Sequence, residues 1–196
     1  VMETAYDILF FWVARMIMMG IENTGQIPFD TVYFHGLVRD AKGEKMSKTK
    51  GNVINPLETI DQYGTDALRF ALSTGNTPGS DMKLTTQRLE AGRNFANKLW
   101  NASRFVMSNI DSIDQNAYES AINNMAEAPS EDRWIVSKLN RLIESVSKLL
   151  EGFQFGEAQR EIYDFLWNEY CDWYIELAKI RLRDENTTSP LPILVH

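Results

Sequence analysis

Residues 43–52 read Gly43-Glu44-Lys45-Met46-Ser47-Lys48-Thr49-Lys50-Gly51-Asn52, with lysine and hydroxyl side chains enclosed between two glycines. The segment follows an apolar, β-branched run that ends near Val38. Glycine lets a loop swing and approach a ligand closely, and lysine supplies a mobile charge with three donors for phosphate oxygens. This composition indicates a mobile phosphate-binding loop. A solvated basic turn would have the same composition, because most short charged loops bind nothing.

Within this loop, Lys45-Met46-Ser47-Lys48-Thr49 resembles the second signature of the class I aminoacyl-tRNA synthetases, which usually reads Lys-Met-Ser-Lys-Ser. Thr49 keeps the hydroxyl and adds a methyl. Between about residues 7 and 183, further stretches resemble the valyl-tRNA synthetases of that class: Asp7-Ile8-Leu9-Phe10-Phe11-Trp12-Val13-Ala14-Arg15-Met16, His35-Gly36-Leu37-Val38-Arg39-Asp40, Asn94-Phe95-Ala96-Asn97-Lys98-Leu99-Trp100-Asn101 and Trp167-Asn168-Glu169-Tyr170-Cys171-Asp172-Trp173-Tyr174.

The resemblance implies that Lys45, Ser47 and Lys48 are catalytic, and that the two lysines bind the phosphates of ATP. Such lysines act by stabilising charge that develops on the phosphates while the aminoacyl-adenylate forms. The implied reaction of the full-length enzyme activates valine with ATP, as its Mg²⁺ complex, and transfers the valyl group to tRNA(Val). We expect no metal site within this chain.

Composition sets limits on the class of protein. The 196 residues suffice for one large or two small domains, and 24% charged and 44% hydrophobic residues are ordinary for a globular protein. A formal charge of −7 argues against a general polyanion binder, so contacts with RNA require local basic groups. The single cysteine, Cys171, cannot form an internal disulfide and favours a reducing cytoplasm. The start at Val1, directly before a helical pattern, suggests a piece of a longer chain.

Residues 5–19 are predicted to form a buried helix that ends at Gly20, because they are apolar on nearly every side and too few to span a membrane. Asp7 in its first turn has the position of a helix-dipole or capping carboxylate. The resemblance implies a different role, in which Asp7 binds the ammonium group of valine while Ile8 and Trp12 line the side-chain pocket.

Residues 31–34 predict a buried parallel strand, since they are β-branched and aromatic. His35 and Gly36 then lie at its carboxyl end, where open α/β sheets bind ligands. His35 could equally be a packed or capping histidine. By resemblance, His35, Gly36 and Val38 lie against ATP.

Two helices are predicted after the loop. Asn55 caps the first, with Pro56 at its first position and Gly64 at its end; Thr65 or Asp66 caps the second. Residues 75–79 break the chain. We therefore expect residues 1–79 to be a C-terminal remnant of a Rossmann-like α/β catalytic domain.

Residues 80–196 are predicted to form an antiparallel α-helical bundle, the anticodon-binding domain of the resembled family. Its helices are expected at residues 85–110, from residue 130 to a turn at residues 152–156, and at residues 157–183; residues 111–129 are a connection with at most a short helix. The last helix is expected to bury Ile162, Leu166, Tyr170, Trp173, Leu177 and Ile180. The tail from residue 186 is predicted to be loose or to begin another helix pair, because it has two prolines and no period.

One flank of the first bundle helix combines amides, a cation and an aromatic ring: Asn94, Lys98, Asn101 and Phe105. A solvated polar face is the plainer interpretation. Because single-stranded RNA is bound by stacking on aromatics and by amide and cation contacts, and because the resembled family meets the anticodon with this helix, we predict a tRNA contact here. Arg93 and Arg104 are predicted to hold backbone phosphates.

The sequence leaves two alternatives open: an isoleucyl- or leucyl-type synthetase, or a non-catalytic helical module that binds RNA or protein. The pattern of Asp7, Ile8 and Trp12 favours the valine enzyme. The chain has neither the His-x-Gly-His signature of class I nor an inserted editing domain, so the isolated residues are expected to be inactive.

Overall fold

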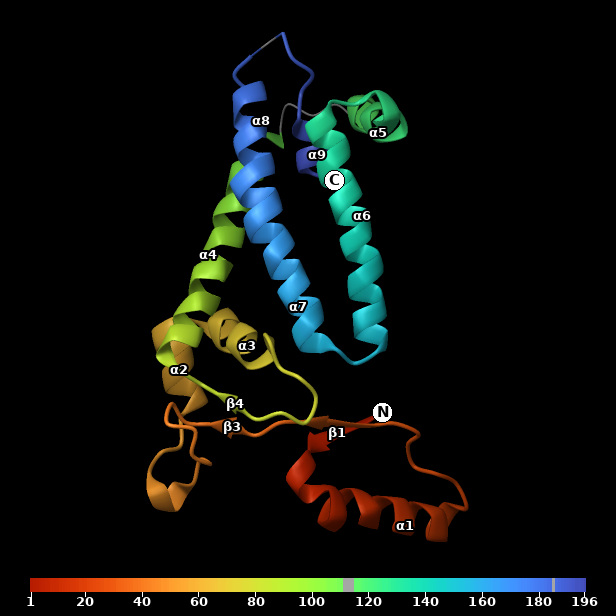
Figure 1. The fold of residues 1–196 in the computed structure, drawn as a ribbon, viewed down its shortest axis with the longest axis vertical. Helices are drawn as coiled ribbons and strands as arrows, with labels where there is room; N and C mark the ends of the chain where they lie inside the picture. The colour runs from red at the N-terminus through yellow and green to blue at the C-terminus, as the bar shows by residue number, and fades with distance from the viewer. Residues whose placement is uncertain (111–114, 185) are drawn as a thin grey trace. The chain divides into compact units, whose positions relative to one another are not determined.

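The computed structural model describes residues 1–110, 115–184 and 186–196, and the chain divides into two compact units. The first comprises Val1–Gly92 and Leu149–Glu157, and the second Arg93–Lys148 and Ala158–His196. Short strands lie in the first unit, and the second is helical (Figure 1). The predicted class, mainly α with a Rossmann remnant and a helical bundle, is confirmed.

The strands of the first unit pair in parallel. Strand β1 (Met2–Ala5) pairs with β2 (Val32–His35), and β3 (Val38–Arg39) pairs with β4 (Met82–Lys83). The predicted parallel strand is therefore confirmed as β2, although it is half-buried rather than buried. Strands β1 and β4 were not predicted, because an alternation of apolar and polar residues cannot be recognised in segments this short.

The N-terminal helical stretch differs from its prediction. A 3₁₀ turn η1 (Tyr6–Ile8) and a π-helical turn η2 (Leu9–Val13) lead into α1 (Ala14–Thr24). The helix passes through Gly20 and ends at Gly25, which takes the left-handed conformation with φ 69°. The predicted burial of this stretch is also wrong: within the described residues Val13 is buried, whereas Phe10 is 77% exposed and Trp12 52% exposed.

Helices α2 (Pro56–Tyr63) and α3 (Thr65–Ser73) form the helical core of the first unit. As predicted, Asn55 caps α2, its side chain accepting a hydrogen bond from the Leu57 N–H, and Gly64 ends it. The predicted caps of α3 are wrong, because Gly64 also serves as the N-cap and Thr65 is already helical. The buried cluster consists of Leu68, Ala71, Met82, Leu84 and Leu89.

The second unit is built on the long helices α4 (Thr86–Met107) and α6 (Ser130–Glu151) and on a third helical run. That run consists of α7 (Phe155–Asp164), the π-helical η6 (Phe165–Tyr174) and α8 (Ile175–Arg181). The connection holds α5 (Gln115–Asn123) and a 3₁₀ turn η5 (Met125–Glu127), close to the predicted short helix; residues 111–114 of that prediction lie outside the described residues. Gly156 is helical, so the predicted turn ends at residue 154.

The predicted core face of the third helical run is only partly right. Phe165, Cys171, Tyr174, Ile175 and Ala178 are buried, whereas Trp173 is 64% exposed and Ile180 66% exposed. Leu177 is also exposed. The π-helical turns of η6 are the cause, since each turn holds more residues than an α-helical turn. A stripe extrapolated at 3.6 residues per turn therefore stays on the core as far as Leu166 and Tyr170 and moves off it from Trp173 onward.

The tail is docked, which corrects the prediction of a loose segment. Leu191, Ile193 and Leu194 of α9 (Leu191–Leu194) are buried in the same cluster as Ile135 and Tyr174. The buried apolar side chains and the i-to-i+4 turns hold this segment in place, although its sequence shows no long helical repeat of apolar residues.

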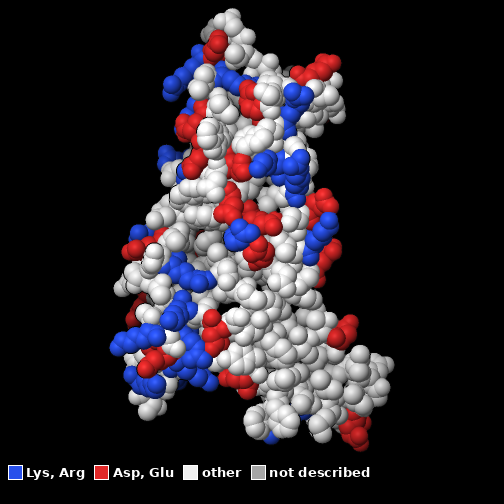
Figure 2. Space-filling model, in the orientation of Figure 1, with Lys and Arg blue, Asp and Glu red and all other residues white. Residues whose placement is uncertain are grey.

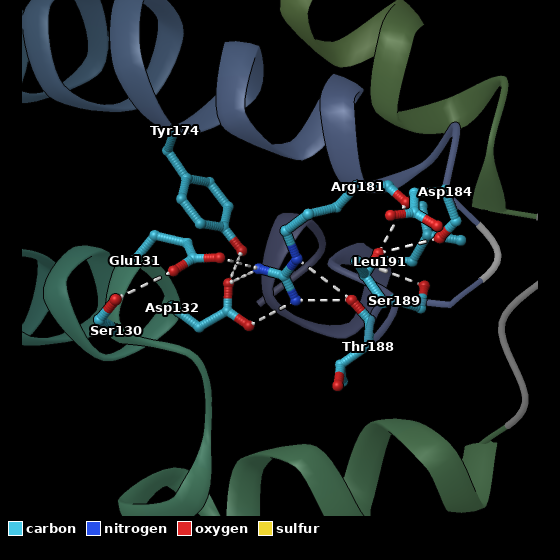
Figure 3. A network of polar contacts seen from close by, with 10 residues as sticks. Ser130, Glu131, Asp132, Tyr174, Arg181, Asp184, Thr188, Ser189 and Leu191 are labelled. Atoms are coloured by element: carbon cyan, nitrogen blue, oxygen red, sulfur yellow. Dashed lines mark hydrogen bonds and ion pairs between the residues drawn. The ribbon is translucent and has the colours of Figure 1, made fainter.

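A buried polar network anchors the start of this tail (Figure 3). Arg181 donates to both carboxylate oxygens of Asp132, at 2.6 and 3.0 Å, and to the Thr188 carbonyl oxygen at 2.7 Å. The Tyr174 hydroxyl donates to Asp132 at 2.7 Å. Burial, followed by its hydrogen bond to Asp132, raises the pKa of Tyr174, so the phenol stays protonated. The network joins α6, α8 and the tail.

Cys171 is a free, buried thiol, and burial raises its pKa.

Among the helices of the described residues, none is both long and apolar enough to cross a membrane.

Candidate functional site

The loop at residues 43–52, hereafter the signature loop, leaves strand β3 and returns toward α2. Arg39 of β3 forms an antiparallel bridge with Lys45, which fixes the start of the loop. Ser47 caps a 3₁₀ turn η3 (Lys48–Lys50) by accepting a hydrogen bond from the Thr49 N–H at 3.3 Å. The predicted catalytic hydroxyl of Ser47 thus has a structural partner, and the Lys48 side chain is exposed.

Asp40 and Asn52 hold the two ends of the signature loop together. Asp40 Oδ1 accepts from the N–H groups of Lys42 and Glu44, at 3.0 and 2.8 Å. The Asn52 amide donates to Asp40 Oδ2 at 2.9 Å and accepts from the Ser47 N–H, also at 2.9 Å. The Asn52 hydrogen bond, followed by that from Glu44, lowers the pKa of Asp40, so the carboxylate is charged at neutral pH.

Lys45 and Asp7, for which the family resemblance implies contacts with different substrates, meet in an ion pair. The Lys45 ammonium lies 3.2 Å from Asp7 Oδ2, with the Lys45 side chain 63% exposed and the Asp7 side chain 33% exposed. An exposed pair of this kind contributes only about 0–1 kcal/mol, so a ligand can readily replace either partner. Asp7 lies in η1, and Ile8 and Trp12 follow it with exposed side chains.

The predicted ATP-binding residues at the end of β2 line one cavity. Its volume is about 250 Å³, and its lining includes His35, Gly36, Val38 and Glu3. His35 Nε2 lies 3.4 Å from the Glu3 carboxylate. The structure therefore brings His35, Gly36 and Val38 together, on a half-open site at the sheet edge.

Asp81 is a further member of this region, and no pattern in the sequence indicates it. Its carboxylate accepts from the Leu37 N–H at 2.8 Å, from Arg39 at 2.5 Å and from the Tyr6 hydroxyl at 3.2 Å. The Leu37 hydrogen bond is the largest cause of the lowered pKa of Asp81. Asp81 is separated from its partners by more than 40 residues of sequence, so only the pairing of β3 with β4 reveals the contact.

Basic side chains gather over the signature loop and its neighbouring strands. Figure 2 shows this cluster in the region where Figure 1 draws β3 and the loop, while the surface over α1 has few charges. The exposed lysines of this part of the chain are Lys42, Lys45, Lys48, Lys50 and Lys83. Lys50 is paired with Glu44 at 3.2 Å. The cluster is a local basic surface on an acidic chain.

On α4 the predicted tRNA-binding residues divide into two groups. Asn94, Asn101, Arg93 and Arg104 are exposed. Lys98 and Phe105 are half-buried by contacts within the bundle: Lys98 donates to Asp172 at 2.6 Å, and the Lys179 ammonium lies 5.5 Å from the centre of the Phe105 ring. The structure does not bring the six residues to one open face.

Trp100 is an exposed aromatic residue of α4 that sequence reasoning missed. It is 68% exposed, and at 3.6 residues per turn it lies on the face of Arg93 and Arg104. The helical spacing alone places this indole between the two arginines, so the sequence could have indicated it.

Comparison with known proteins bears on both units. Residues 1–85 match the family described as tRNA synthetases class I (I, L, M and V), and residues 132–194 match the anticodon-binding domain of tRNA ligase. The valine–tRNA ligase of Dehalococcoides mccartyi strain CBDB1 is 65% identical over 195 residues, and that of Symbiobacterium thermophilum is 57% identical over 182 residues.

Solved structures share the fold. The LeuRS of Agrobacterium radiobacter K84, in a ternary complex with tRNA and LeuAMS, superposes with a TM-score of 0.71 at 21% identity, covering 98% of this chain and 23% of that one. The methionyl-tRNA synthetase of Mycobacterium tuberculosis, in complex with methionyl-adenylate, has a TM-score of 0.67 at 20% identity, covering 98% and 37%.

The alignments extend over all or nearly all of this chain, 100% for the first relative and 93% for the second. The chain spans about a fifth of the length of these relatives, 22% and 20% respectively. It carries the signature loop; the first family match lies within the first unit, and the second match lies in the second unit apart from residues 149–157. The chain therefore belongs to the class I tRNA synthetase family, as a segment related in sequence to the valine–tRNA ligases.

Proposed function

We propose that the chain is part of a ligase that activates valine with ATP to valyl-adenylate, releases pyrophosphate and transfers the valyl group to tRNA(Val). The observation that carries this proposal is the 3.2 Å approach of Lys45 to Asp7. It brings the candidate phosphate-binding loop to the candidate amino-acid-binding carboxylate. Adenylate formation needs this proximity, because it joins the carboxylate of the amino acid to the α-phosphate.

Each side chain then has a defined task. Asp7 binds the ammonium group of valine, and Ile8 and Trp12 form the wall of its apolar pocket. Lys45 and Lys48 stabilise the negative charge that develops on the phosphates of ATP, and Ser47 holds the turn that carries Lys48. His35, Gly36 and Val38 contact the nucleoside part of ATP in the cavity at the end of β2.

ATP is proposed to bind as its Mg²⁺ complex. Among the described residues, no group of three or more His, Cys, Asp and Glu side chains is placed to hold a metal ion. The lysine-rich loop fits the phosphates themselves, since ammonium groups are strong donors to phosphate oxygens.

Residues 80–196 are proposed to be the anticodon-binding bundle, and residues 1–79 the catalytic part. The tRNA surface is proposed to lie on α4, with the exposed Asn94 and Asn101 contacting bases and Arg93 and Arg104 holding phosphates. Lys98 and Phe105, half-buried within the bundle, are proposed to contribute from its side. We add Trp100, whose exposed indole can stack on an unpaired base.

Amino-acid-dependent exchange between pyrophosphate and ATP tests the proposal in a full-length ligase that carries this segment. Valine should support rapid exchange, whereas isoleucine and leucine should support far less. An apolar valine pocket rejects threonine by only about 10²-fold, a worked value for valine enzymes in general, so some exchange with threonine is expected. Preferential exchange with isoleucine or leucine would move the protein to another branch of the class, and no exchange with any amino acid would favour a non-catalytic RNA-binding module.

A further inference from the structure

The signature loop is closed by a bridge in which one amide side chain uses both of its polar atoms. Asn52 donates through Nδ2 to Asp40 Oδ2 at 2.9 Å and accepts through Oδ1 from the Ser47 N–H at 2.9 Å. The same Nδ2 lies 3.4 Å from the Lys45 carbonyl oxygen. Asn52 thus contacts the backbone on both sides of Met46, at Lys45 and at Ser47, directly before Lys48.

Asp40 fixes the other side of this bridge. Its side chain accepts from the Lys42 and Glu44 N–H groups, and its backbone N–H donates to the Glu44 carbonyl oxygen at 3.1 Å. The turn at residues 40–44 is therefore rigid, and Asn52 extends that rigidity to Ser47. Charged acceptors form stronger hydrogen bonds than neutral ones, which makes the link from Asn52 to Asp40 the strong point of the bridge.

A loop with lysines at its centre needs such a device. Lysine side chains are long and flexible, so their ammonium groups can be positioned only if the backbone beneath them is held. Electrostatic stabilisation of a transition state also depends on donors that are fixed before the reaction.

We propose that Asn52 and Asp40 are positioning residues that hold the signature loop in the conformation from which Lys45 and Lys48 contact phosphate. The inference rests on the proposed function for its effect on catalysis, and on the hydrogen bonds alone for its effect on the loop. Neither residue touches a substrate in this scheme; both act through the loop backbone.

A charge exchange between the two positions tests the bridge. In Asn52→Asp two carboxylates face each other, and in Asp40→Asn two amide donors face each other, so each single variant loses the hydrogen bond. The double variant D40N/N52D restores it with the roles reversed: the amide at position 40 donates to the carboxylate at position 52. That carboxylate still accepts from the Ser47 N–H, and the amide oxygen at position 40 still accepts from the turn.

The first measurement is amide hydrogen exchange of the peptide covering residues 43–52 in the full-length protein. Exchange should be faster in both single variants and return toward wild type in the double variant. Asn55→Asp is the matched control, because it adds the same charge nearby at an N-cap where Asn and Asp are equally favourable. Equal exchange in wild type and both single variants would overturn the proposal, whatever the activity of the protein.

The second measurement is valine-dependent pyrophosphate exchange with the same variants. Each single variant should lower kcat by roughly 10-fold to 100-fold, the usual effect of misplacing a catalytic group, with the KM for valine and the Tm nearly unchanged. The double variant should regain most of kcat. Single variants that loosen the loop while kcat stays at the wild-type value would overturn the positioning role, and an inactive wild type would instead refute the proposed function, leaving hydrogen exchange to decide the bridge.

Discussion

At the scale of single residues, the lysines of the signature loop differ in the partners they have. Lys45 is paired with Asp7 and Lys50 with Glu44, whereas no ion pair of Lys48 is found among the described residues. Lys48 is therefore the lysine most available to a phosphate group. The sequence could predict the loop and its lysines, because the motif is contiguous.

We expect Lys48→Ala to slow valyl-adenylate formation by on the order of 10²–10³, the usual effect of removing one preorganised charge-stabilising group. The affinity for valine should change little, because Lys48 acts on the transition state. Pre-steady-state adenylate formation measures this, with Lys50→Ala as the matched control that should stay close to wild type. A large loss of valine affinity at an unchanged rate would contradict the assigned role.

Trp12 allows a second prediction at this scale. Its side chain is 52% exposed in the described chain, so Trp12→Ala should leave the fold intact. It should weaken valine binding and reduce selection against other amino acids more than it slows chemistry, because a pocket wall contacts ground state and transition state alike. Exchange kinetics with valine and isoleucine test this; unchanged selectivity would show that Trp12 does not line the pocket.

Residues that act through long-range contacts were beyond sequence reasoning. Asp81 contacts Leu37 and Arg39 only because β4 pairs with β3. Asn52 lies next to the recognised motif, but its hydrogen bond to Asp40 depends on the path of the loop. Functional residues that are adjacent in the sequence can thus be predicted from it, whereas residues that meet only through tertiary contacts cannot.

At the scale of elements, the sequence predicts helices well where the α-helical period is kept. Asn55, Pro56 and Gly64 mark α2 correctly, and Ser130 begins α6 as expected. The errors cluster at π-helical segments, η2 and η6, where side chains advance differently per turn. Nothing local in the sequence marks these turns, so the exposed face of Trp173 and Ile180 could not be predicted.

The buried network of Arg181 supports a prediction about the stability of these elements. Arg181→Ala should destabilise the bundle by roughly 3–5 kcal/mol, because it leaves the buried Asp132 carboxylate without its cationic partner. Asp132→Asn should cost less, because Arg181 keeps an ion pair with Glu131 at 3.2 Å. Asp132 is 2% exposed, and the Arg181 side chain 9%. Urea unfolding followed by tryptophan fluorescence measures the loss, and Arg183→Ala, at an exposed position of the same helix end, is the control. A loss below about 1 kcal/mol, the range of surface pairs, would mean that the network does not anchor the tail.

At the scale of the whole molecule, the chain combines a basic loop with an acidic overall charge of −7. Such a chain cannot attract RNA by its total field and needs local contacts with defined bases and phosphates. The two units carry these tasks separately: residues of the signature loop belong to the first, and the exposed residues of α4 from Arg93 onward belong to the second.

The isolated 196-residue chain should form no valyl-adenylate. It lacks the His-x-Gly-His signature, which in the resembled family binds ATP from the opposite side of the site. Purified chain, assayed for valine-dependent pyrophosphate exchange, should give the background rate, with a full-length ligase as positive control. Exchange clearly above background would show that the signature loop and its neighbours suffice for activation.

The bundle is expected to meet tRNA through the exposed side chains of α4. Trp100 is 68% exposed on the face of Arg93 and Arg104, whereas Phe105 is half-buried and packs against the core of the bundle. We therefore expect Trp100→Ala to cost about 1–3 kcal/mol in tRNA binding, the range for one lost stacking contact, without a change in Tm. Trp173→Ala is the matched control, an indole 64% exposed on η6, and should bind tRNA like wild type.

Phe105→Ala should lower both Tm and the affinity for tRNA, because truncation also removes packing. Titration of a full-length ligase with cognate tRNA and with a tRNA carrying an altered anticodon separates the cases: a discrimination unchanged by Trp100→Ala would mean that the anticodon is bound elsewhere on the bundle.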